Sequence, residues 1–120
     1  MSVREVVRKR RPKVVELELP GGDKVWIKSL SGEGRAHFRD IVEKSKVNSG
    51  LKSESVVAMA LCESDGTLTY DFENPDDLKE IREMDGADVD LIFLRFLSVS
   101  GLNTESVEQL QKNSEATPNG

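Results

Sequence analysis

Histidine and cysteine, two of the side chains that most often carry catalysis, each occur once in this chain, and neither belongs to a catalytic motif. His37 is the only histidine and Cys62 the only cysteine. The sequence has no Gly-x-Ser-x-Gly motif, no Walker-type phosphate loop and no dinucleotide-binding glycine pattern. Because a general base or a nucleophile needs a second group that activates it, we expect His37 to be an ordinary, partly exposed residue and Cys62 to pack in the core. The pattern predicts a protein that is not an enzyme.

One acidic cluster, Asp85, Asp88 and Asp90, resembles a set of metal ligands. It lacks the central glycine and the distal glutamate of a calcium-binding loop. On a helix these three carboxylates would also be spread around the axis. We therefore expect no metal site and no cofactor.

Length and charge predict one small acidic domain. A chain of 120 residues usually forms a single core. Its 17 basic and 22 acidic side chains give a net charge of −5, which disfavours binding of nucleic acid or an anionic membrane by the body of the protein. The single cysteine makes no internal disulfide, the polar start MSVREVVRKRR lacks the apolar core of a signal peptide, and Arg95 interrupts the longest apolar cluster. We expect a protein of a reducing cytosol that does not enter membranes.

The charges are unevenly distributed along the chain. Residues 4–13 hold six basic side chains and one acid, whereas residues 63–90 hold eleven acids and two basic side chains, giving local charges of +5 and −9. We interpret residues 1–12 as a flexible basic arm, which is either only solvated or docks on an acidic partner or on nucleic acid.

The first half of the chain predicts a β-hairpin followed by helices. Apolar and polar residues alternate in 14–19 and in 24–28, and the turn residues Pro20-Gly21-Gly22-Asp23 lie between these two segments. Trp26 lies on the face opposite Val25 and Ile27, and either packs in the core or is exposed for a partner. Ser31 is a plausible N-cap for a helix that starts near residue 33, and 43–52 is predicted to be a loop. The apolar run that follows, about 53–61, fits a helix better than a strand, although periodicity does not separate the two.

The second half predicts two well-delimited helices. Residues 68–72 suggest a short extended segment, and Asn74-Pro75 begins a helix that ends near residue 83. Asp85 caps a helix from about 86 to 100 that ends at Gly101 and is apolar nearly all round. Such a helix is either fully buried within the domain or shares one face with another chain. A last short helix capped by Thr104 is expected, then a disordered tail from 113 to 120.

These elements together predict an α+β fold, with an N-terminal β-hairpin packed on a small bundle of about four to five helices in one domain over residues 13–112. Sites of catalysis, metal binding and cofactor binding are not expected. The apolar residues with the strongest case for partner contact, between copies of the chain or with a helical client, are Trp26, Phe38, Ile92, Phe93, Phe96 and Leu97.

The order of four segments resembles the tail assembly chaperones of long-tailed, non-contractile (lambda-like) bacteriophages and prophages. These are the hairpin KVVELELPGGDKVWIKSLSGEGRAHF, the run VVAMALCESDGTLTYDF, the acidic DDLKEIREMDGADVD, and LIFLRFLSVSGLNTESVEQLQKN. The resemblance covers about residues 13–113. It rests on order, spacing and total length, because none of the segments is a chemical signature, and it does not include the basic arm.

The resemblance implies a protein that acts in the host cytoplasm and is absent from the finished virion. Members of this family bind the long, helical tape measure protein, keep it soluble and help to recruit tail tube subunits. The family commonly also makes a longer product by programmed frameshifting, whose extension contacts the tail tube protein, and this chain would be the short form. Repeated weak contacts along a long client favour self-association, so a homo-oligomer is expected. Two alternatives are a structural minor tail or head-tail connector protein, and a small nucleic-acid-binding regulator that uses the basic arm.

Overall fold

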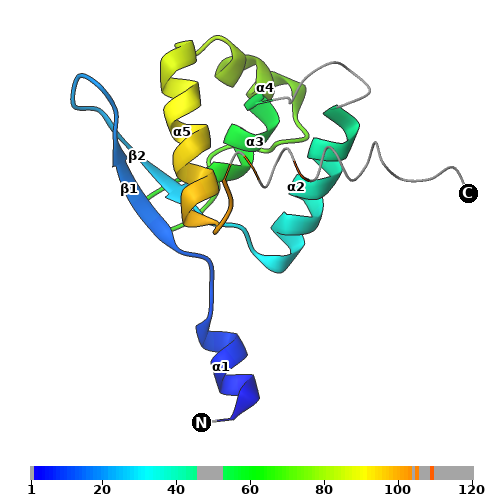
Figure 1. The fold of residues 1–120 in the computed structure, drawn as a ribbon. Coiled ribbons are helices and arrows are strands. Elements are labelled where there is room, and N and C mark those ends of the chain that lie inside the picture. The colour runs from blue at the N-terminus through cyan, green and yellow to red at the C-terminus, as the bar shows by residue number, and fades with distance from the viewer. Residues whose placement is uncertain (1, 46–52, 104, 106–108, 110–120) are drawn as a thin grey trace, which may run out of the picture.

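The computed structural model describes residues 2–45, 53–103, 105 and 109, and within them it confirms the α+β fold (Figure 1). The elements follow in the order α1 (Val3–Lys9), β1 (Val14–Glu18), β2 (Lys24–Lys28), α2 (Gly32–Ser45), α3 (Ser53–Ala60), β3 (Leu61–Cys62), α4 (Pro75–Arg82) and α5 (Gly86–Val99). Among these residues no helix is both long and apolar enough to cross a membrane.

The sheet is antiparallel, with the strand order β1-β2-β3. Its register pairs Val15 with Ile27 and Leu17 with Val25, so these four side chains face the helices and contribute to the core. The predicted hairpin is confirmed. Gly21 and Gly22 both have positive φ values, of 96° and 99°, a conformation that explains the paired glycines in the turn.

The central element of the core is α3, which packs against α2, α4, α5 and β2. All of its residues from Ser55 to Ala60 are buried. The helix ends at Ala60, and the next two residues form β3 beside β2. The apolar run 53–61 is therefore helix and then strand, because only an extended end can pair with the edge of β2.

The N-terminal helix α1 stands apart from this core (Figure 1). Residues 1–12 were expected to be a flexible arm, but residues 3–9 form a helix capped by Ser2, whose Oγ accepts a hydrogen bond from the Glu5 backbone N–H at 3.2 Å. None of its residues is buried.

The helix α2 extends through Ser45, past the point where a loop was predicted to begin. Ser31 caps it as predicted, since its Oγ accepts a hydrogen bond from the Gly34 N–H at 3.0 Å. The rest of the predicted loop, 46–52, lies outside the described residues. So do most of the last predicted helix and the tail 113–120.

The predicted limits of α4 and α5 agree with the structure. Asn74 and Asp85 are their N-caps, and Pro75 occupies the first helical turn of α4. Gly101 follows the C-cap of α5 with a φ of 75°. The segment after β3 is less regular than predicted, since a single bridge joins Leu68 to Cys62 and the residues that follow form bends.

The C-terminal end of α5 is fastened to the start of α2 by one buried residue. Ser100 accepts a hydrogen bond from the Leu30 N–H at its Oγ, at 3.2 Å, and one from Arg35 Nη2 at its carbonyl oxygen, at 2.6 Å. The guanidinium also places positive charge at the negative end of the helix dipole. This contact joins segments that are far apart in the sequence.

Replacing Ser100 with alanine is expected to lower the free energy of unfolding by about 1–2 kcal/mol, because the partly buried Leu30 N–H loses its acceptor. Ser98→Ala is the matched control, since Ser98 lies on the exposed side of the same helix. Urea unfolding followed by circular dichroism measures both. Equal midpoints for the two variants would show that the bond contributes nothing.

Candidate partner-binding surfaces

Most of the predicted partner-binding residues lie inside the molecule. Phe38, Ile92, Phe96 and Leu97 are at most 2% exposed, and the Phe38 and Phe96 rings meet edge to face with centroids 6.2 Å apart. The prediction that these four form a surface is wrong for this conformation. The physical reason is that α5 lies against α3 and β2, so the apolar side chains of that face fill the domain's own core.

Trp26 and Phe93 are half-buried. Phe93 packs against the edge of the core. Trp26 stands opposite Glu16 and Cys62 in the sheet, on the face away from the helices, and is not part of the core cluster. The interpretation that Trp26 packs in the core is therefore wrong. A partner role for Trp26 and Phe93 stays a prediction.

The sequence left open whether α5 is fully buried or leaves one face open to another chain, and the structure shows a buried side and an exposed side. One side is buried in the core, while Leu91 and Leu94 on the other side are 40% and 51% exposed. These two leucines and the half-buried Phe93 form its apolar contribution to the surface, whereas Phe96 does not.

His37 and Cys62 lie in different surroundings, the first exposed and the second buried. The His37 side chain is exposed, 3.9 Å from Glu33 and with its ring centroid 5.2 Å from that of Phe72. Cys62 is 5% exposed, and burial raises the pKa of its thiol, an effect that the charge of Lys28 only partly offsets. Reactive cysteines have a lowered pKa. Among the described residues, no group of three or more histidine, cysteine or acidic side chains could hold a metal ion.

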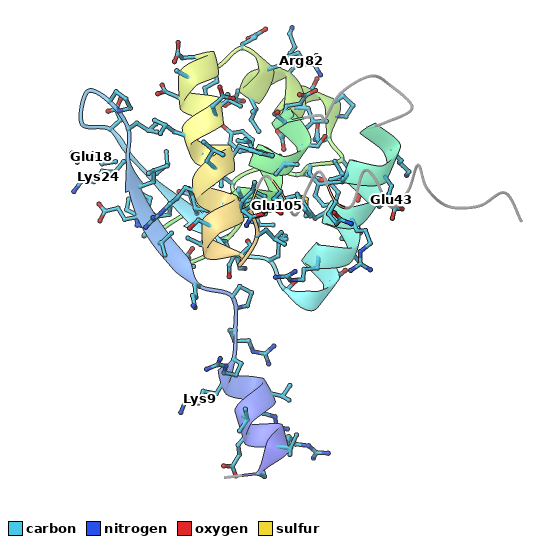
Figure 2. All side chains as sticks on the ribbon, in the orientation of Figure 1. Lys9, Glu18, Lys24, Glu43, Arg82 and Glu105 are labelled. Atoms are coloured by element: carbon cyan, nitrogen blue, oxygen red, sulfur yellow. The ribbon has the colours of Figure 1, made fainter. Side chains whose placement is uncertain are left out.

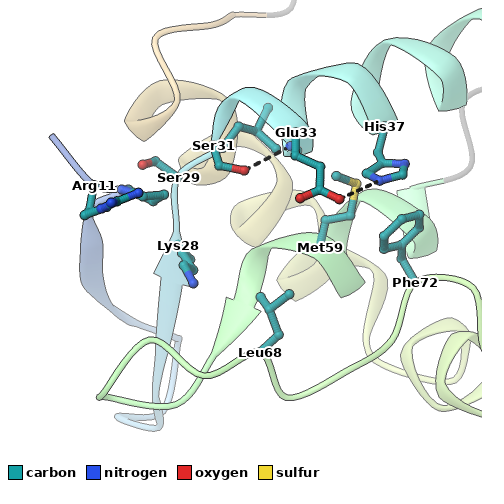
Figure 3. A pocket seen from close by; sticks show the side chains of 12 residues that line it. Arg11, Lys28, Ser29, Ser31, Glu33, His37, Met59, Leu68 and Phe72 are labelled. Atoms are coloured by element: carbon teal, nitrogen blue, oxygen red, sulfur yellow. Dashed lines mark hydrogen bonds and ion pairs between the residues drawn. The ribbon is translucent and has the colours of Figure 1, made fainter. Parts of the chain in front are cut away.

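A groove of about 500 Å³ opens between the start of α2 and the segment that follows β3 (Figure 3). Three separate parts of the chain supply the apolar residues Leu30, Met59, Leu68 and Phe72 to its lining. Leu68 is 45% exposed. Figure 3 shows Met59 and Phe72 beside Glu33 and His37, and Leu68 farther from them.

The rim of this groove carries both signs of charge. Arg11 and Lys28 lie at one end, and Glu33 with His37 at the other. An apolar floor with a polar rim is the pattern that receives one face of an amphipathic helix. The composition of this groove fits that pattern.

A second, smaller groove of about 280 Å³ lies among α3, α4 and α5. Ile81, Met84 and Val89 supply its apolar lining, and Glu54 and Asp90 supply acidic groups. Arg82 also lines it, 3.7 Å from Glu54. The surrounding residues 75–90 contain seven acids and two basic side chains, so this end of the molecule is strongly negative.

The exposed apolar residues of α1 were missed by the sequence analysis, although their spacing was readable. Val3, Val6 and Val7 follow the three-and-four spacing of one helical stripe and are 80%, 41% and 61% exposed. The lining of the larger groove had no such signal, because it is assembled from segments far apart in the sequence.

Comparisons of the chain with models of known protein families, with curated proteins and with solved structures found no match in any of the three.

Proposed function

We propose that this protein is a tail assembly chaperone of long-tailed, non-contractile bacteriophages or prophages. It binds the tape measure protein in the host cytoplasm, keeps it soluble and helps to recruit tail tube subunits, and it is absent from the mature virion. The observation that carries the proposal is the order and spacing of the four segments quoted above.

The fold supports this proposal by uniting those segments. The hairpin, α3 with β3, α4 and α5 all contribute to one core. The larger groove supports it in a second way, because its apolar floor and mixed-charge rim suit one face of a long amphipathic helix. A client with many such faces would bind many copies, and repeated weak contacts give a high total affinity.

Co-expression with the tape measure protein of the same gene cluster tests the proposal. We expect that this otherwise aggregating client becomes soluble and copurifies with the chaperone. A client that stays insoluble, also when the longer frameshifted product is supplied, would contradict the proposal. Retention of the protein in purified particles would instead favour a structural tail role.

The groove itself is tested by Leu68→Asp, which places a charge on its apolar floor. We expect the amount of soluble tape measure protein to fall at least about tenfold, because a carboxylate in an apolar contact loses its hydration. Leu94→Asp is the matched control, since Leu94 is similarly exposed, at 51% against 45%, but does not line the groove.

Both leucine variants are expected to fold, and a thermal melt of each checks this. An equal loss of client with the two variants would show that the groove is not the binding surface. In that case the client would bind through α5 or another surface.

A further inference from the structure

The N-terminal helix α1 has the composition of a binding element, but none of its residues is buried against the described part of the chain. It is seven residues long. Helices this short are marginal in water without tertiary contacts. Yet its capping is complete, with Ser2 at the N-cap, Glu5 in the first turn and Arg8 and Lys9 in the last. The sequence thus favours a helix, and the apolar stripe of Val3, Val6 and Val7 is exposed. We infer from these two features that contact with another surface stabilises the helix.

The charges of α1 indicate the nature of that surface. Residues 4–13 carry +5, and the valine stripe lies beside the arginines at positions 4 and 8, which are one helical turn apart. The complement is an apolar groove with an acidic border. The smaller groove has this character. Met84 and Val89 are half-buried in its lining, Glu54 and Asp90 supply acidic groups, and the one basic side chain of its described lining, Arg82, lies 3.7 Å from Glu54.

The helix cannot reach this groove in its own chain. Lys13 is held to the body by two hydrogen bonds with Ser29, at 2.8 and 2.9 Å, so only residues 10–12 link α1 to the domain. Fully extended, three residues span about 11 Å, and the helix adds about 10 Å. Figure 2 shows Lys9 of α1 and Arg82 of the groove at opposite ends of a molecule whose longest extents are 45 and 44 Å.

We propose that α1 of one copy docks in the acidic groove among α3, α4 and α5 of a second copy. The valine stripe covers the apolar lining, and Arg4 and Arg8 face acidic side chains such as Asp90. Because the arm and the groove are different surfaces of the same chain, each copy offers one free arm and one free groove. Such head-to-tail contacts form a ring or an open chain.

Protein is a better partner for this arm than nucleic acid. The valines at positions 3, 6 and 7 form an apolar stripe that a phosphate backbone would leave exposed, and the chain as a whole carries −5. The proposal does not depend on the chaperone function, because an arm that links copies would do so whether or not the larger groove binds a client.

The test is a complementary charge swap followed by sedimentation velocity over a range of protein concentrations. The unchanged chain is expected to assemble. Arg4→Glu/Arg8→Glu in the arm, and separately Asp90→Arg in the groove, are each expected to require at least about tenfold higher concentration for half-assembly. Mixing the two variants is expected to restore assembly, because each reversed arm then meets a reversed groove. Arg39→Glu/Lys44→Glu on α2 is the matched control and should assemble normally.

Three results would overturn the proposal. The unchanged chain could sediment as a monomer at every concentration, assembly could survive removal of residues 1–11, or the mixture could fail to assemble while thermal melts show both variants folded. A monomer whose arm binds a short DNA or RNA duplex in a filter-binding assay would identify the arm as a nucleic-acid element instead. Failure of the tape measure experiment alone would leave the arm contact unaffected.

Discussion

Replacing Phe96 with alanine is expected to lower the free energy of unfolding by about 3–5 kcal/mol, which is a large part of the stability of a domain of this size. Phe96 is fully buried, and its ring meets that of Phe38 edge to face. Truncation therefore removes both the buried aromatic surface and this ring contact, and leaves a cavity.

Leu94→Ala is the control for this measurement, because it shortens a large apolar side chain of the same helix that is 51% exposed. Its expected effect is less than about 1 kcal/mol. Urea denaturation followed by circular dichroism compares the two variants. Similar losses would contradict the placement of Phe96 in the core. If Phe96→Ala does not fold, the smaller change Phe96→Leu should still cost more than Leu94→Ala.

This placement also changes how a partner-binding experiment on α5 must be designed. A charged substitution at Phe96 would abolish binding by unfolding the protein, whatever surface the client uses. Leu91 and Leu94 are the residues of α5 through which a contact can be tested without disturbing the core.

In the folded protein, Cys62 is expected to react with Ellman's reagent at least about a hundredfold more slowly than in urea at the same pH, because reaction requires opening of the structure. The thiol is 5% exposed, in a strand that pairs with β2 on one side and with Leu68 on the other. Burial raises its pKa, so the thiolate that reacts is also rarer in the folded state. Equal rates in the two conditions would show that this edge of the sheet opens freely.

The same pKa shift has a consequence for stability. The folded protein holds the Cys62 thiol proton more tightly than the unfolded chain does. The contribution of this thiol to the free energy of unfolding is therefore complete below the ordinary thiol pKa of about 8.5, and it is lost as the pH rises through the raised pKa of the folded state. Urea unfolding between about pH 8 and about pH 9.5 should show this loss in the natural chain. In Cys62→Ala the loss over this range should be smaller. The phenol of Tyr70 also has a raised pKa, through burial and its bond to Glu80, so it contributes at higher pH.

The sequence by itself determined the elements whose signals are local. Paired glycines define the hairpin turn, Asn74-Pro75 and Asp85 begin α4 and α5, and Gly101 ends α5, because caps and turns depend on the conformational preferences of one to four adjacent residues. The α+β fold followed from these elements. The division of the charge between a basic arm and an acidic second half was equally visible, because it requires only counting.

Only the tertiary structure decided which apolar residues remain at the surface. In the sequence, Phe96 and Leu94 both belong to a helix that is apolar nearly all round, but α3 and β2 cover one side of that helix and leave the other side open. The larger groove was decided in the same way, since Leu30, Met59, Leu68 and Phe72 come together only when three segments pack. Burial depends on contacts between residues distant in the chain, and a periodic pattern within one helix does not specify which of its faces the rest of the domain will cover.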